Sequence, residues 1–223
     1  MSTRPRDLKA VIFDLDGTLV DTADEFVIVV QALRAEHDRE AMDPERIRAS
    51  VSNGARALVA LALDIVEEEP VFEEKRQRLL ELYSGVLGSV ARPYPGIEAL
   101  IGELERRGIG WGISTNKPRA YTDPLLERLA MRPEPGSVVC PDDVRERKPH
   151  PESLYRNCRE LGCGPHQAVY IGDHQRDIEA GRRAGMYTIA AAYGYIEPDD
   201  DPFSWGASAH ARQSTDLLEL ILG

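Results

Sequence analysis

The hydrophobic pattern changes its period after the first strand-like segment, and this change constrains the fold more than any other feature. The run Ala10–Phe13 is short, apolar and rich in β-branched residues, which is typical of a buried parallel strand. From about Asp21 to Ala91, apolar residues recur at helical spacing, and we find no convincing strand. Beyond that stretch, strand and helix patterns alternate. The order predicts an α/β protein with a Rossmann-like parallel sheet and a helical segment inserted after its first strand.

Cap and turn residues indicate where the inserted segment begins and ends. Asp21-Thr22 offers a helix N-cap, and the Pro- and Gly-rich run Arg92–Gly96 interrupts the helical pattern. We therefore expect a Rossmann-like catalytic core made of residues 1–20 and 93–223, with a helical cap domain made of residues 21–92.

The core should alternate helices with strands. We expect helices at 97–104, 121–129, 151–161, 176–184 and 216–222, and strands at 109–114, 137–140, 168–171 and 187–191. The acidic segment from Pro198 to Gly206 has no predicted place. In open parallel sheets, ligands bind at the carboxyl ends of the strands, so the chemistry should lie there.

Charge and hydropathy exclude several kinds of partner. The formal net charge of −11 disfavours nucleic acids and anionic membranes. No apolar run approaches the roughly 20 residues that span a bilayer, and the run after the polar N-terminus is too short for a signal peptide. The three cysteines show no CxxC spacing, which indicates free thiols. We expect a cytoplasmic monomer or homodimer that acts on a small molecule.

Polar side chains gather at four predicted strand ends or in the loops nearby. They are Asp14 and Asp16, then Ser114 to Lys117, then Lys148, then Asp173 and Asp177. Clustered carboxylates repel one another unless a cation lies among them, and oxygen ligands without His or Cys favour Mg²⁺. One carboxylate can attack phosphorus while a second transfers protons. A lysine and a hydroxyl can hold the phosphoryl oxygens.

Four segments of the chain resemble the motifs of the haloacid dehalogenase-like phosphatases. In chain order they are Val11–Thr18, Ile113–Pro118, Lys148–Pro151 and Ile171–Ile178. A single motif of this kind is moderately specific. The ordered set, which covers the chain from residue 11 to about 195, is very specific.

The resemblance implies roles for the residues that match the motifs. Asp14 would be the nucleophile that forms an aspartyl-phosphate, and Asp16 would be the general acid/base. Thr115 and Lys148 would bind the transferring phosphoryl group. Asn116 would contact the substrate or the phosphate.

The resemblance also implies a magnesium site and a moving cap. Mg²⁺ would be bound by Asp14, the backbone carbonyl of Asp16 and Asp173, with Asp177 supporting it directly or through water. Closure of the helical cap over the core would exclude water until the acyl phosphate forms.

A finer likeness points to the phosphoglycolate phosphatase group, and in it to the N-acetylmuramic acid 6-phosphate phosphatases of bacterial cell-wall recycling. It depends on the less specific segments Ser52–Val59, Tyr193–Ile196 and Trp205–Ala207. The implied substrate is a small phosphate ester: N-acetylmuramate 6-phosphate first, 2-phosphoglycolate second. Both carry a carboxylate, which Arg56 could bind through two hydrogen bonds. His174 departs from the Ser, Asp or Thr common after the motif's aspartate.

Other interpretations of these residues remain open. A dehalogenase would attack carbon and would not need Asp16. A sugar-phosphate mutase would return the phosphoryl group to a sugar, and a non-catalytic binding protein would use the scaffold alone. Structural roles are also possible, with Lys148 as a solvated loop charge, Asp173 and Asp177 as helix caps, and Arg56 as an exposed arginine.

Overall fold

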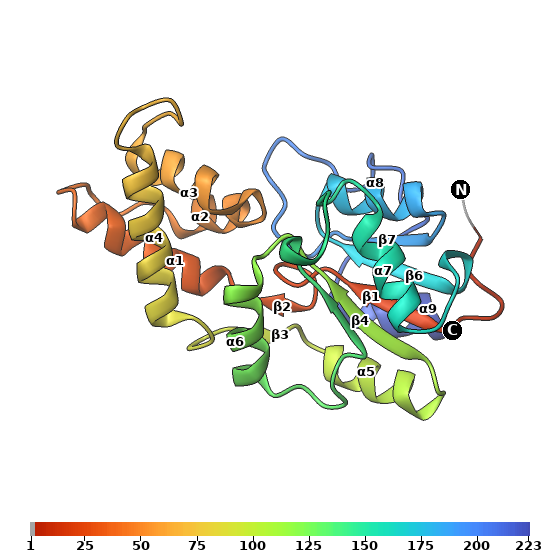
Figure 1. The fold of residues 1–223 in the computed structure, drawn as a ribbon. Helices are drawn as coiled ribbons and strands as arrows, with labels where there is room; N and C mark the ends of the chain where they lie inside the picture. The colour runs from red at the N-terminus through yellow and green to blue at the C-terminus, as the bar shows by residue number, and fades with distance from the viewer. Residues whose placement is uncertain (1–2) are drawn as a thin grey trace.

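The computed structural model describes residues 3–223, and its centre is a six-stranded parallel sheet (Figure 1). The strands lie in the order β5-β4-β1-β6-β7-β8, and each neighbouring pair is parallel. They are β1 (Ala10–Phe13), β4 (Gly110–Ser114), β5 (Ser137–Val139), β6 (Ala168–Gly172), β7 (Tyr187–Ala191) and β8 (Ala209–Ala211). The sheet confirms the predicted α/β class. The edge strand β8 was not predicted, because its sequence Ala-His-Ala carries no strand pattern.

The register of the three central strands brings their carboxyl ends to one level. Phe13, the last residue of β1, pairs with Ile113 of β4 on one side and Ile171 of β6 on the other. The residues that follow these strands therefore emerge at the same edge of the sheet.

Helices cover both faces of the sheet. They are α5 (Ile97–Arg106), α6 (Arg119–Leu129), α7 (Glu152–Glu160), α8 (Gln175–Ala184) and α9 (Leu217–Leu222). Alternate residues of β1 enter different apolar clusters: Val11 and Phe13 pack with residues of α5 and α9, whereas Ala10 and Ile12 pack with α7 and α8. A strand buried on both faces explains why Ala10–Phe13 reads as a continuous apolar run.

The four α-helices between β1 and α5 lie together at one end of the molecule (Figure 1). They are α1 (Ala23–Ala35), α2 (Pro44–Ser50), α3 (Gly54–Leu63) and α4 (Phe72–Val86), with a short 3₁₀ turn at Val51–Asn53. We use the word cap for residues 21–92, which contain them. The Asp43 side chain caps the start of α2, since it accepts a hydrogen bond from the Glu45 N–H, and Pro44 occupies the first turn.

The two chain segments that join the cap to the sheet pair with each other. Strand β2 (Val20–Asp21) lies antiparallel to β3 (Arg92–Pro93). The buried Glu25 reinforces this junction, because its Oε1 accepts hydrogen bonds from the N–H groups of Val90 and Ala91 at 3.2 and 3.1 Å. These strands were not predicted, because each is only two residues long and β3 contains Pro93, so neither shows the alternating hydrophobic pattern of a strand.

The segment from Pro198 to Gly206, for which no secondary structure or position was predicted, contributes a side chain to the core. Trp205 is buried with Ile178 of α8 and Ala190 of β7, and its Nε1 donates to Asp200 at 2.8 Å. Within residues 3–223, none of the helices combines the length and apolar character needed to cross a membrane.

Candidate active site

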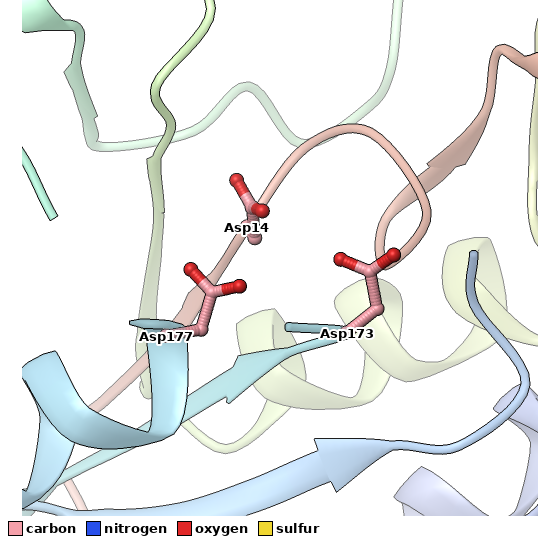
Figure 2. A group of neighbouring side chains, drawn as sticks. All are labelled: Asp14, Asp173 and Asp177. Carbon is pink, nitrogen blue, oxygen red and sulfur yellow. The ribbon is translucent and has the colours of Figure 1, made fainter. Parts of the chain in front are cut away.

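Three aspartate side chains converge at the carboxyl edge of the sheet (Figure 2). Asp14 directly follows β1, Asp173 directly follows β6, and Asp177 lies in the first turn of α8. All three are buried, and one carboxylate oxygen from each lies within 4.8 Å of the others. The in-register ends of β1 and β6 account for this meeting of residues that are far apart in the sequence.

Lys148 is a buried cation between two of these aspartates. Its Nζ lies 2.8 Å from Oδ1 of Asp14 and 2.7 Å from Oδ1 of Asp177, and its side chain is 1% exposed. It also donates to the Ser114 carbonyl at 2.9 Å and to the Tyr170 hydroxyl at 3.0 Å. The alternative of a solvated loop charge is therefore wrong.

The site holds more negative charge than Lys148 neutralises. Burial, with repulsion from Asp14 and Asp177, raises the pKa of Asp173 to about 8. Burial also raises the pKa of Asp14 to about 6, although Lys148 opposes the shift. For Asp177 burial acts in the same direction, but the attraction of Lys148 outweighs it and the pKa is lowered. A further cation would relieve this imbalance.

The donor set fits a hard divalent cation such as Mg²⁺. It consists of carboxylate oxygens from Asp14, Asp173 and Asp177, the kind of ligand such an ion prefers. Among the described residues, Oδ2 of Asp177 is buried without a hydrogen-bond partner, and a cation would satisfy it. The loop also keeps space beside Asp173, because a Cβ at Gly17 would lie 2.0 Å from Oδ2 of Asp173. Gly17 has φ +78°, a conformation that glycine adopts readily.

Asp16 makes its contacts at the boundary between the core and the cap. Its Oδ1 accepts a hydrogen bond from the Thr22 hydroxyl at 2.6 Å, just before α1. Its carboxylate also pairs with Lys117, whose Nζ lies 3.0 Å from Oδ1. Asp16 is thus two residues from Asp14 along the chain but held by different partners.

Thr115 and Asn116 follow β4, the strand next to β1. The buried Thr115 hydroxyl accepts a hydrogen bond from the Lys117 N–H at 3.0 Å. Asn116 donates to the backbone carbonyl of Lys148 at 3.3 Å. Both residues therefore belong to the same edge of the sheet as Asp14, where the resemblance places phosphoryl binding.

Arg56 lies on the surface of the cap, in α3. Its side chain is 54% exposed, and its Nη1 is 2.6 Å from Oε2 of Glu67, with Glu73 at 3.9 Å. Its guanidinium also lies over the Phe72 ring. The structure brings together the aspartates and Lys148, whereas the contacts of Arg56 within the described part of the chain are with other residues of the cap.

Comparison with known proteins identifies the family. Residues 11–191 match the model of the haloacid dehalogenase-like hydrolases. The chain belongs to this family. The N-acetylmuramic acid 6-phosphate phosphatase of Pseudomonas aeruginosa is 44% identical to this hydrolase over 218 residues, which cover 96% of each chain. A phosphoglycolate phosphatase of Xanthomonas campestris pv. campestris is 38% identical over 214 residues, 95% of each chain.

A solved structure supports the fold of this hydrolase. The crystal structure of a protein described as a predicted phosphoglycolate phosphatase from Haemophilus somnus matches with a TM-score of 0.84. The match is 24% identical in sequence and covers 96% of this chain and 98% of that one. The family resemblance inferred from the motifs is confirmed, and the chain is an enzyme of the phosphatase type.

Several residues around the site of this hydrolase were not predicted. Ser52 of the cap donates to Oδ2 of Asp173 at 3.0 Å, and Arg176 donates to the Ser52 carbonyl at 2.5 Å. His174 caps α8, since its Nδ1 accepts a hydrogen bond from the Arg176 N–H at 3.2 Å. Lys117 stands inside a quoted motif, so its position was a usable signal. Ser52 begins the quoted segment Ser52–Val59, so its position was also a signal, but its contact with Asp173 depends on tertiary packing.

Mg²⁺ should bind this hydrolase more tightly as the pH rises towards the pKa of Asp173, about 8. Below that pH the metal-free protein keeps a proton on Asp173, and the cation must displace it. One displaced proton changes the affinity by up to about tenfold per pH unit. Thermal unfolding with and without magnesium should show a larger rise in Tm near pH 8 than near pH 6, the values about which Asp173 and Asp14 titrate. In Asp173→Asn this difference should shrink, and equal rises in the wild type would contradict the prediction.

Proposed function

We propose that this phosphatase hydrolyses a small phosphate monoester through a phosphorylated Asp14. The observation that carries the proposal is the position of Asp14, buried at the end of β1, 2.8 Å from Lys148 and beside Asp173 and Asp177. Asp14, Asp173, Asp177 and the backbone carbonyl of Asp16 would hold Mg²⁺. When bound, the cation would neutralise the crowded aspartates and polarise the phosphoryl group.

In the first half of the reaction, a carboxylate oxygen of Asp14 attacks phosphorus and the bond from phosphorus to the ester oxygen breaks. Asp16 donates a proton to that oxygen, so that the alcohol leaves uncharged. Lys148 and the Thr115 hydroxyl hold the phosphoryl oxygens during the transfer. Asn116 helps to orient the substrate at the same edge of the sheet.

In the second half, Asp16 takes a proton from a water molecule, whose oxygen attacks phosphorus. The bond between phosphorus and Asp14 breaks, inorganic phosphate forms, and both carboxyl groups return to their starting states. The same carboxyl group serves as acid and then as base because the leaving oxygen and the attacking water occupy the same side of the phosphoryl group.

We propose that residues 21–92 act as a cap that opens and closes about the paired strands β2 and β3. These strands are the two connections between the cap and the sheet, and they lie side by side. Ser52, in the 3₁₀ turn between α2 and α3, donates a hydrogen bond to Asp173, which supports a position of the cap against the site. Closure would keep water away until Asp14 is phosphorylated.

The proposed substrate is N-acetylmuramate 6-phosphate, with 2-phosphoglycolate second. The first is supported by the name of the Pseudomonas aeruginosa relative at 44% identity, and the second by that of the Xanthomonas relative at 38% identity. The first substrate would give the enzyme a role in bacterial cell-wall recycling. Each compound offers a carboxylate in addition to its phosphate.

Either Arg176 or Arg56 could bind that carboxylate, and a substitution at each position distinguishes between the two. Arg176 reaches the Ser52 carbonyl at the seam of core and cap, and its Nε is buried without a hydrogen-bond partner among the described residues. Arg56 is engaged by Glu67 and Glu73. We expect Arg176→Gln to raise KM for both compounds about tenfold, the effect of one charge-assisted hydrogen bond, and Arg56→Gln to raise it less than about twofold.

The control for the arginine variants is p-nitrophenyl phosphate, which has no carboxylate. Its KM should change little in either variant if the arginine recognises the carboxylate. A larger rise in KM for Arg56→Gln than for Arg176→Gln, restricted to the two carboxylate compounds, would assign the role to Arg56.

The test of the proposed function is a screen for phosphate release with magnesium over a panel of metabolites. The panel should include N-acetylmuramate 6-phosphate, 2-phosphoglycolate, β-glucose 1-phosphate and nucleoside monophosphates, with Asp14→Asn as the control. Release of phosphate that depends on Asp14 supports the proposal. Conversion of β-glucose 1-phosphate into an isomer without phosphate release would instead show a mutase.

A further inference from the structure

Lys117 is a buried lysine that the proposed reaction does not use, and it lies against the proposed acid/base. Its Nζ is 3.0 Å from Oδ1 and 3.3 Å from Oδ2 of Asp16, and its side chain is 6% exposed. Because the second hydrogen-bond partner of the Asp16 carboxylate is the Thr22 hydroxyl, the direction of this carboxylate depends on Lys117 and Thr22 together.

The cap supplies the surroundings on the other side of Lys117. Its Nζ donates to the Tyr83 hydroxyl at 2.6 Å and lies 4.7 Å from the centre of the Tyr83 ring and 5.3 Å from that of Phe26. These two rings, from α4 and α1, stack at 4.3 Å. Both are buried, so the ammonium group is enclosed by two aromatic rings, one hydroxyl and one carboxylate.

An ammonium group has three hydrogens, and these contacts account for them. When Asp16 is ionised, two can point to its two oxygens and the third to Tyr83. The lysine therefore bridges the acid/base of the core and two helices of the cap. If α1 and α4 moved away, Lys117 would lose its third hydrogen-bond partner and both aromatic neighbours at once.

We propose that Lys117 is a positioning residue that holds Asp16 in its proton-transfer position while the cap is seated on the core. The inference depends on the proposed function, in which Asp16 protonates the leaving oxygen. Without Lys117, Thr22 would be the one remaining side-chain partner of the carboxylate among residues 3–223, and the carboxylate could rotate away from that oxygen. Misplacement of a reacting group by about 1 Å can lower a rate about 100-fold.

The test compares two leaving groups. p-Nitrophenolate leaves without a proton, whereas the alcohol of a sugar or alkyl phosphate needs one, so only the second reaction needs a well-placed acid. We expect Lys117→Met to lower kcat/KM about 30- to 100-fold for the alkyl ester found by the phosphate-release screen, and less than about threefold for p-nitrophenyl phosphate. Lys117→Arg, which keeps the charge, should recover part of the loss for the alkyl ester.

Tyr83→Phe removes only the hydroxyl that accepts from Lys117 and keeps the packed ring. It should reproduce the same dependence on the leaving group with a smaller loss, about three- to fivefold. Tyr121→Phe is the matched control, because the Tyr121 ring lies 5.7 Å from that of Tyr83 but the Tyr121 hydroxyl is not among the described hydrogen-bond partners of Lys117. The kcat/KM of Tyr121→Phe should stay unchanged for both leaving groups.

Coupling to Asp16 separates positioning from a structural role. In an Asp16→Asn enzyme, adding Lys117→Met should change kcat/KM less than about twofold, because the group it positions is already absent. Equal losses for both leaving groups, or losses that add in the double variant, would overturn the inference. So would a rise in KM confined to substrates with a carboxylate, which would make Lys117 a substrate-binding residue. Failure of the wild type to release phosphate would instead refute the proposed function.

Discussion

Asp14→Asn should lower kcat at least about 10⁴-fold, because the amide cannot take the phosphoryl group from the substrate. The loss should not come from unfolding. Burial already disfavours the charge at this position, as the raised pKa of Asp14, about 6, indicates, and asparagine has nearly the same shape without the charge. Its Oδ1 can still accept the hydrogen bond from the Leu15 N–H, which is 2.8 Å long in the structure. Phosphate release and thermal unfolding, measured on the same preparation, check both parts.

A beryllium fluoride complex gives an independent readout for Asp14. In the wild type with magnesium, this phosphate mimic should bond to the Asp14 carboxylate and raise Tm, whereas Asp14→Asn should show no rise. Turnover of Asp14→Asn at the native rate would refute the aspartyl-phosphate mechanism. An unfolded Asp14→Asn protein would contradict the view that the Asp14 charge is unfavourable for the metal-free fold.

The placement of the aspartates could be predicted from the sequence because it depends on local patterns. An apolar run ending in Asp14 and another ending in Asp173 predict two parallel strands, and parallel strands present their carboxyl ends at one edge. Asp177 follows Asp173 by about one helical turn, which directs it to the same place. No long-range information beyond the direction of the strands was needed.

Contacts between the cap and the core could not be predicted in the same way. Lys117 meets Tyr83 only because α4 packs beside α1 and across the loop after β4, and nothing in either segment encodes that approach. The binding of a substrate carboxylate by Arg56 stays a prediction, whereas the cap contact with Asp173, which was not predicted, is made by Ser52, four residues earlier. On a helix or turn, the direction of a side chain towards a distant domain depends on packing.

The burial of Lys148 is a case in which composition was misleading. The stretch from Asp142 to Lys148 is highly charged and, taken alone, indicates a solvated loop. In the structure Glu152 accepts hydrogen bonds from the backbone of this loop, and Lys148 turns inward to Asp14 and Asp177. Only the ordered motifs predicted this role, and the stability of the metal-free protein should depend on it.

Lys148→Met should lower the free energy of unfolding of the metal-free protein by about 3–5 kcal/mol, since two buried carboxylates lose their cation. It should also lower kcat about 10³-fold, because a donor to the phosphoryl oxygens is lost. Magnesium should recover part of the stability, because the ion replaces some of the missing positive charge, but not the rate. Denaturant unfolding with and without magnesium, together with phosphate release, measures these effects.

The double variant Asp14→Asn/Lys148→Met distinguishes loss of charge balance from loss of packing. Without the Asp14 charge, Asp177 is the carboxylate that still lacks its cation, so the double variant should be more stable than Lys148→Met alone by about 1–3 kcal/mol. Its activity should be no lower than that of Asp14→Asn, because the nucleophile is already absent. If Asp14→Asn changed the free energy of unfolding by the same amount in the Lys148→Met protein as in the wild type, the methionine would be disturbing the packing around Tyr170 and Ser114 and not the charge balance. Because Lys148 stabilises this site chiefly by charge, we expect the effects of the two substitutions on the free energy of unfolding not to add.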